Sequence, residues 1–154
     1  MFKRIWKTLI ALQIALMVTT LAAVPVSAAE LRGYDNIVIA SGDVINDDLY
    51  LGGDRIAIYG TVNGDVLAAG DTIIIEGTVN GDVLAFGGTI TIGGDVTGSV
   101  RTAGGSVNIG GTIGEDLIVA GGAVDLDEAA AIGRDLVFGA GDINIDSLIG
   151  SDIL

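Results

Sequence analysis

The chain of 154 residues contains no cysteine, no histidine and only one proline. Without these side chains there is no disulfide framework, thiol nucleophile or imidazole base, and the usual zinc and haem ligands are missing. Basic residues are also scarce, with 7 Lys and Arg against 20 Asp and Glu. Because nucleic-acid affinity depends on basic side chains that neutralise phosphates, we expect no nucleic-acid partner.

Glycine and aliphatic residues are abundant instead. The chain has 25 glycines, 50% hydrophobic residues and a formal net charge of -13. Glycine does not recur every third residue, which excludes a collagen triple helix, and the aliphatic content is too high for a disordered linker. We therefore expect one ordered, turn-rich domain.

The N-terminus has the layout of a targeting segment. A basic start at residues 3–7 precedes an apolar run over 8–24 and small residues at 26–29. This pattern is typical of a secretory signal cleaved after Ala28 or Ala29, or of an uncleaved membrane anchor, since the run is close to the minimum length for a span. Both interpretations predict an extracytoplasmic location: secreted, on the cell surface or periplasmic.

Three segments follow from this layout: a leader or anchor over 1–28, a short linker over 29–34, and a repeat domain over 35–154. Beyond residue 29 the chain keeps four arginines and no lysine against all 20 acidic residues, a formal charge of -16. Self-repulsion on this scale is weakened by salt, so the composition is also compatible with a high-salt environment.

The body of the chain is a repeat of 17 residues, aligned on position 1, an aspartate after a glycine-rich corner. The aligned residues are Asp48, Asp65, Asp82, Ser99, Asp116, Asp135 and Asp152, with one step of 19 residues. Positions 2, 9, 11 and 15 are aliphatic, as in Val66, Ile73, Ile75 and Val79. Gaps of two residues indicate strands, and glycines near positions 6, 7, 13 and 17 indicate corners.

This pattern predicts an all-β fold, a single-stranded parallel β-helix with three short strands per coil. Helical repeats would need apolar spacings of three and four residues and would not tolerate so many glycines. Side-chain burial within one coil cannot offset the conformational entropy lost when its residues become ordered. Stability must therefore come from stacking neighbouring coils about 4.8 Å apart.

The segment GTVNGDVLAAGDTIIIEGTVNGDVLAFGGTITIGG at 60–94 resembles the bactofilins, a family of polymer-forming cytoskeletal proteins. The shared feature is a Gly-x-Val-x-Gly-Asp corner between short aliphatic strands, and the resemblance covers residues 35–154. It implies a right-handed, triangular β-helix that polymerises end to end without nucleotide into a membrane-associated scaffold. The leader departs from typical cytoplasmic bactofilins, so exported or membrane-anchored relatives are the closer resemblance.

Two interpretations apply to the aspartate column at position 1. Aspartate suits a corner because its side chain hydrogen-bonds the backbone of a turn. Clustered carboxylates also suit divalent cations, but the Gly-Gly-x-Gly-x-Asp nonapeptide of calcium-binding β-rolls is not repeated here. We favour turn chemistry and predict no metal site and no cofactor.

Candidate self-association residues fall into two groups. Position 3 should point outward and form an apolar stripe interrupted only by Arg101; its apolar members are Tyr50, Leu67, Leu84, Ile118 and Val137. Such a stripe predicts lateral packing, a partner or a membrane surface, although strand propensity alone would also select these residues. The second group is Ile153 and Leu154, which begin another coil and offer an edge for end-to-end pairing.

Two further patterns bear on the outer surface. Position 10, also expected to point outward, becomes polar after the second coil; its occupants are Ala57, Ile74, Thr91, Asn108, Asp125 and Asn144. Connections of two extra residues occur at 40–44 and 127–131, on one corner. These segments share no chemistry, and we interpret both as tolerated bulges.

No catalytic constellation emerges from the sequence. Acyltransferase β-helices use an 18-residue turn and a histidine, and pectin-cleaving β-helices place carboxylates beside Lys or Arg in a cleft. We expect a non-enzymatic structural protein that self-associates end to end into filaments or scaffolds at the cell envelope. The alternative is a monomeric surface spacer or adhesion module that binds cations or glycans. The expected partners are the protein itself and membrane or envelope components, without nucleotide.

Overall fold

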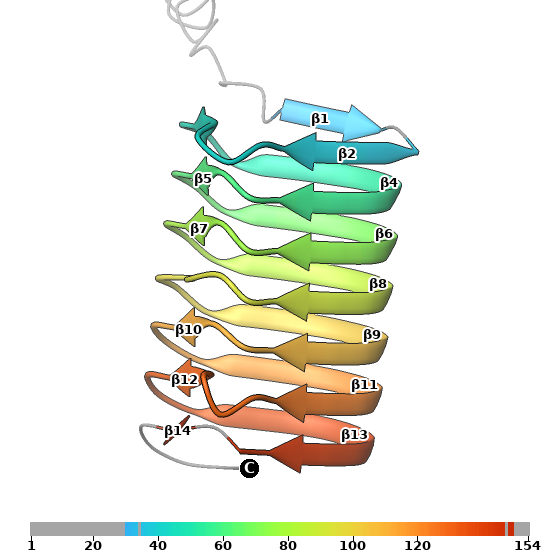
Figure 1. Ribbon diagram of the computed structural model, residues 1–154, viewed down its shortest axis with the longest axis vertical. Helices are drawn as coiled ribbons and strands as arrows, with labels where there is room; N and C mark the ends of the chain where they lie inside the picture. The colour runs from blue at the N-terminus through green and yellow to red at the C-terminus, as the bar shows by residue number, and fades with distance from the viewer. Residues whose placement is uncertain (1–29, 34, 147, 150–154) are drawn as a thin grey trace, which may run out of the picture.

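The computed structural model describes residues 30–33, 35–146 and 148–149, and these residues form strands without any helix. The predicted leader over 1–28 lies outside the described residues. The chain is a β-solenoid of about six turns, which confirms the predicted fold class (Figure 1). We number the coils from their position-1 residue: coils 1 to 5 begin at residues 48, 65, 82, 99 and 116, and coil 6 begins at 135.

Each coil contributes one long strand over positions 2–11. These strands are β4 (Leu49–Ile58), β6 (Val66–Ile75), β8 (Val83–Ile92), β9 (Val100–Ile109), β11 (Leu117–Leu126) and β13 (Leu136–Ile145). Ahead of them, β1 (Glu30–Gly33) and β2 (Asn36–Ile39) both pair with β4. All pairs are parallel and in register, so position-equivalent residues such as Val66 and Val83 face each other.

A short third side closes the coil at positions 14–15. Its strands are β3 (Val44–Ile45), β5 (Thr61–Val62), β7 (Thr78–Val79), β10 (Thr112–Ile113), β12 (Ala131–Ile132) and β14 (Leu148–Ile149). In coil 3 single bridges from Val96 to Val79 and to Ile113 continue the ladder across the gap between β7 and β10. The near halves of the long strands run left and the far halves run right as the chain descends, which makes the coil right-handed (Figure 1).

The expectation of three separate short strands per coil is wrong in one respect. The first two sides belong to a single ten-residue strand that bends at position 7, where Asp54 has no ladder partner between the pairs Gly53–Gly70 and Arg55–Thr72. Position 6 is glycine in coils 1 to 5, and a Cβ at Gly70 would overlap the carbonyl oxygen of Gly53 in the preceding coil. Backbone pairing therefore continues on both sides of a corner that the sequence pattern marks as a break.

The core consists of five inward ladders at positions 2, 4, 9, 11 and 15. In coil 2 these are Val66, Ala68, Ile73, Ile75 and Val79, each at most 1% exposed. Burial of one such aliphatic side chain is worth about 2 kcal/mol, and every added coil extends all five ladders. All of the described buried core lies within residues 37–136.

One polar side chain interrupts the core. Thr102 occupies inward position 4 in coil 4, between Ala85 and Val119, and is 5% exposed. Its Oγ1 is buried without a hydrogen-bond partner. A buried hydroxyl in this state costs stability, because it loses its bonds to water without replacement.

Glycines at position 13 set how closely the coils stack. Gly60, Gly77, Gly94 and Gly111 are buried at the corner before the third side. A Cβ on Gly77, Gly94 or Gly111 would overlap the position-13 carbonyl oxygen of the preceding coil. These glycines are required by contact between coils, in addition to the turn within each coil.

Candidate functional site

Position 1 forms a column on one edge of the rod, which we call the acidic corner: Asp48, Asp65, Asp82, Ser99, Asp116 and Asp135. Asp48 Oδ1 accepts the backbone N–H of Asp65 at 2.9 Å, and Asp65 Oδ1 accepts that of Asp82 at 2.8 Å. Asp82 Oδ1 accepts the N–H of Ser99 at 2.8 Å, and Asp116 Oδ1 that of Asp135 at 3.3 Å. Each of these four carboxylates thus joins its coil to the next one.

These bonds refine the turn interpretation. The sequence predicts that aspartate bonds within its own turn, but the acceptor and donor lie in successive coils, 17 or 19 residues apart. Among the described residues, no group of three or more carboxylates is arranged to hold a metal ion. The acidic corner therefore acts on the stacking of coils.

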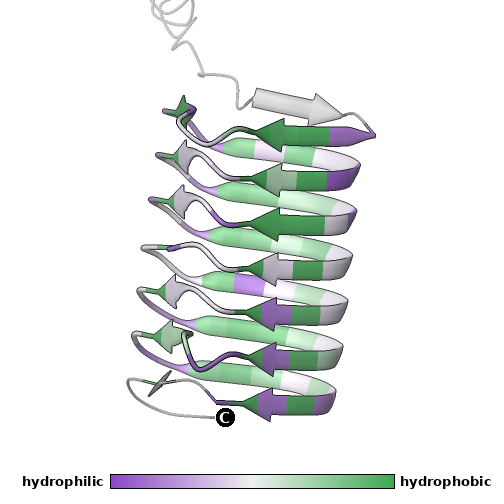
Figure 2. Cartoon of the chain, viewed as in Figure 1, coloured by the Kyte–Doolittle hydropathy of each residue, from purple (hydrophilic) through white to green (hydrophobic). Residues whose placement is uncertain are grey.

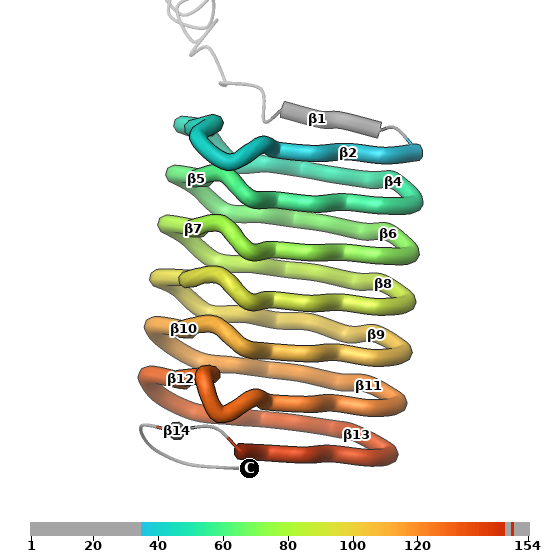
Figure 3. Tube along the Cα trace, in the orientation of Figure 1, coloured from blue at the N-terminus to red at the C-terminus, as the bar shows by residue number. Residues whose placement is uncertain are grey.

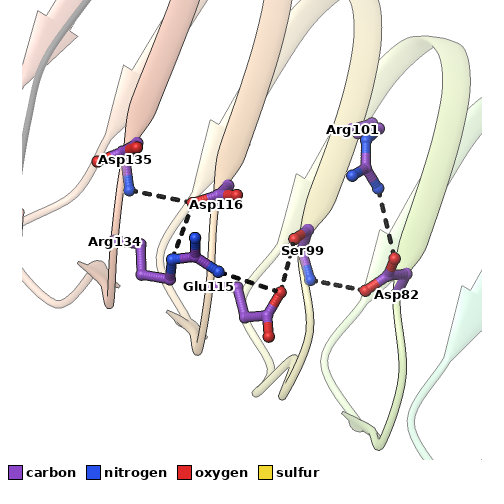
Figure 4. A network of polar contacts seen from close by, with 7 residues as sticks. All are labelled: Asp82, Ser99, Arg101, Glu115, Asp116, Arg134 and Asp135. Atoms are coloured by element: carbon purple, nitrogen blue, oxygen red, sulfur yellow. Dashed lines mark hydrogen bonds and ion pairs between the residues drawn. The ribbon is translucent and has the colours of Figure 1, made fainter.

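Ser99 replaces the aspartate in coil 4, and a wider polar network surrounds it (Figure 4). Ser99 Oγ donates to Glu115 Oε2 at 3.2 Å. Arg134 lies 3.8 Å from the same carboxylate oxygen and 3.5 Å from Asp116 Oδ1. Because the arginine side chain is 59% exposed, these ion pairs contribute little free energy, and they partly neutralise the acidic corner in coils 4 to 6.

The position-3 side chains point outward as predicted, since their neighbours at positions 2 and 4 are inward. Tyr50 and Leu67 are half-buried, whereas Leu84, Ile118 and Val137 are 37%, 43% and 38% exposed. The register places all of them in one line, interrupted by Arg101. Arg101 Nη1 lies 3.4 Å from Asp82 Oδ2, so its charge is directed toward the acidic corner.

Position 5 completes this surface and was missed in the sequence analysis. Its residues also point outward, and they are Gly52, Ala69, Phe86, Ala103, Ala120 and Gly139. We call positions 3 and 5 together the apolar face; in Figure 2 the far halves of the long strands are pale green to white, with one purple segment in β9. The signal for position 5 was present, because it lies two residues after position 3 on the same strand.

The opposite face carries positions 8 and 10 and becomes polar toward coil 6, as predicted (Figure 2). Asn108 and Asn144 both donate to the Asp125 carboxylate, at 3.3 and 2.9 Å. With Ser106 and Asp142 they line a shallow groove of about 440 Å³. The other residues of position 10 in coils 2 to 6 are half-buried or exposed, whereas Ala57 is 2% exposed because its small side chain lies between Val38 and Ile74 in the ladder.

Both longer connections lie at the predicted corner, and each closes a four-residue turn with the same kind of backbone hydrogen bond (Figure 3). The Asp43 N–H donates to the Ala40 carbonyl and the Ala130 N–H to the Asp127 carbonyl, each at 3.0 Å. Gly42 has a φ of 97°, which suits the third residue of a type II turn. Asp43 and Ala130 occupy position 13, so both connections with two added residues carry a side chain at the position where coils 1 to 4 have glycine.

The last long strand, β13, pairs with β11 and with no other described strand. Ile143 occupies inward position 9 there and is 38% exposed, whereas its equivalents Ile73 and Ile90 are fully buried. The candidate residues Ile153 and Leu154 lie outside the described residues. Within residues 30–33, 35–146 and 148–149, this edge combines a strand paired on one side with apolar side chains, the combination that accepts another strand.

No family model matches the chain, and no curated protein or solved structure matches it either. Among the residues described, there is no helix with the length and apolar character of a membrane span.

Proposed function

We propose that this chain is an exported, bactofilin-like structural protein that self-associates end to end into filaments or scaffolds at the cell envelope. It acts without catalysis, cofactor or nucleotide, and its leader either directs export or holds it at the membrane. The observation that carries the proposal is the edge of coil 6 as far as the structure describes it, where β13 has one described partner and Ile143 is 38% exposed.

The mechanism is geometric. Every coil is stabilised by its neighbours, so an end coil gains backbone hydrogen bonds and buries its ladders when another rod stacks on it. No nucleotide is needed, because the stacking interaction is the one that already holds the coils together.

The test uses residues 30–154, which contain all of the described core, purified without nucleotide at low and high salt. Negative-stain electron microscopy and sedimentation should show filaments. Ile143→Asp should abolish them, because it places a charge in the stacking surface, and Ile153→Asp with Leu154→Asp tests the adjoining segment. Thr89→Asp, on an exposed side position, is the matched control and should leave filaments intact.

A stable monomer at every salt and protein concentration would contradict the proposal. It would favour the alternative, a monomeric surface spacer or adhesion module that binds cations or glycans. The feature that supports this alternative is the polar groove between Ser106 and Asn144.

A further inference from the structure

The apolar face has a ridge and a groove that run side by side along the rod. Position 3 forms the ridge, with a large side chain in every coil, whereas position 5 carries glycine or alanine in every coil except coil 3. Thus Leu67 stands beside Ala69, and Ile118 beside Ala120. A surface built in this way fits a second surface whose ridge is displaced by two residues.

The two edges of this face differ in charge. The acidic corner borders it at position 1, and the bend at positions 6–7 borders it on the other side. That bend is Gly-Gly in coils 3, 4 and 5, and it carries a carboxylate only at Asp54 and Asp71.

We propose that a second copy of this chain packs on the apolar face in parallel orientation, related by a two-fold axis that runs along the rod. This inference rests on the proposed function, since it describes how end-to-end filaments pair laterally. Such an axis exchanges positions 3 and 5 within each coil, so the ridge of each rod enters the groove of the other. Large residues then meet small ones: Leu67 opposes Ala69 of the second copy, and Ile118 opposes Ala120.

The antiparallel alternative fits poorly in both shape and charge. A two-fold axis across the rod would place ridge against ridge, with Leu67 opposite Ile118 of the second copy. It would also bring the two acidic corners together along their whole length, with a repulsion of about 1 kcal/mol for each carboxylate pair in water. In the parallel arrangement each acidic corner lies along the glycine bend, where only Asp54 and Asp71 repel it.

Two residues depart from the ridge-and-groove pattern of the face, and at coil 3 two large side chains meet. Phe86 fills the groove in coil 3 and is 46% exposed, and the axis places it against Leu84 of the second copy. Arg101 lies in the ridge, but its guanidinium turns to Asp82 beside a hollow of about 250 Å³ that Leu67 and Leu84 also line. Its aliphatic stem therefore remains available for apolar contact.

The area of the face explains why pairing belongs to filaments. Six coils of about 4.8 Å and five residues of about 3.3 Å give roughly 480 Å² per rod. Stable interfaces bury about 800 Å² per partner, so two single rods pair weakly. Rods already stacked end to end present several such faces at once, and linkage raises their combined affinity.

Cysteine cross-linking of assembled filaments tests the orientation, because the natural chain has no cysteine. Parallel pairing predicts that Ile118→Cys chains cross-link to one another through a bismaleimide too short to span three coils, about 14 Å. Ala123→Cys, in the same coil on the opposite face, should cross-link several-fold less. Cross-linking of an Ile118→Cys and Leu67→Cys mixture in preference to Ile118→Cys alone would show antiparallel pairing and overturn the proposal.

Electron microscopy of charged variants separates this inference from the proposed function. Leu84→Asp should give single filaments, whereas Thr89→Asp, in the same coil on the opposite face, should keep paired ones. Unpaired wild-type filaments would overturn the inference and leave the proposed function standing. If no filaments form, the proposed function fails, and Ile118→Cys dimers in concentrated solution would still support the pairing. Flotation with phosphatidylcholine vesicles, lost in Leu84→Asp, would overturn it in favour of a lipid surface.

Discussion

At the scale of single residues, the glycines of this chain divide into those that contact the preceding coil and those that face open space. Gly77 belongs to the first kind, because a Cβ there would overlap the Gly60 carbonyl oxygen. Gly52 belongs to the second, with no atom within 4 Å of a Cβ. The corner signal in the sequence does not distinguish them, since the difference arises from neighbouring coils.

We expect Gly77→Ala to lower the free energy of unfolding by about 3 kcal/mol, because backbone atoms on both coils must move apart. Gly52→Ala is the matched control and should change it by less than about 0.5 kcal/mol. Urea unfolding followed by circular dichroism measures both variants. Equal losses in the two variants would contradict the contact argument.

Thr102→Val should stabilise the protein by about 1 kcal/mol, because it replaces an unpartnered buried hydroxyl with a methyl group of the same size. Thr89→Val, on the exposed face, serves as the control and should gain little. Thermal unfolding of the two variants gives the comparison. A loss of stability in Thr102→Val would indicate that the hydroxyl has a partner in solution.

At the scale of elements, the sequence predicts the coils, the inward and outward positions and the corner that takes both insertions. It does not predict that the first two sides form one bent strand, because continuity through position 7 depends on pairing with the coil above and below. It also does not explain why the insertions are tolerated. That explanation requires position 13, where Ala130 stands in a column of buried glycines.

Deleting Glu128 and Ala129 restores the standard connection and should destabilise coil 5 by about 3 kcal/mol, because the Ala130 Cβ would then approach the Gly111 carbonyl. The same deletion combined with Ala130→Gly should recover most of that loss. Ala130→Gly alone should cost about 1 kcal/mol, since it adds backbone freedom without relieving a contact.

A double-mutant cycle on these three variants measures the coupling between loop length and residue type. Additive effects of the deletion and the substitution would contradict the link between the insertion and Ala130.

At the scale of the whole molecule, repulsion among the many carboxylates opposes the folded state. The part of the chain beyond residue 29 carries four arginines against 20 acidic residues, and five carboxylates line the acidic corner. The candidate surfaces could be predicted only in part from the sequence, because they depend on contacts between coils. The sequence places Leu67 and Leu84 on one stripe, but the groove beside them and the glycine bend depend on how coils align.

We expect the midpoint of thermal unfolding to rise by several degrees between about 0.01 M and 0.5 M NaCl, as the screening length shortens from about 30 Å to a few ångströms. Differential scanning fluorimetry measures this directly. CaCl2 at matched ionic strength separates screening from binding: an equal rise indicates screening alone, and a much larger rise would contradict the turn interpretation of the acidic corner.

The hydrogen bonds of the acidic corner have a direction along the chain. Each carboxylate belongs to the earlier coil, and each N–H that it accepts belongs to the later one. When the chain is synthesised from its N-terminus, each acceptor carboxylate is therefore in place in a folded coil before the N–H group that binds it has been made. Because these bonds reach only the adjacent coil, each coil can fold as soon as it has been synthesised. About one coil is then unfolded at a time.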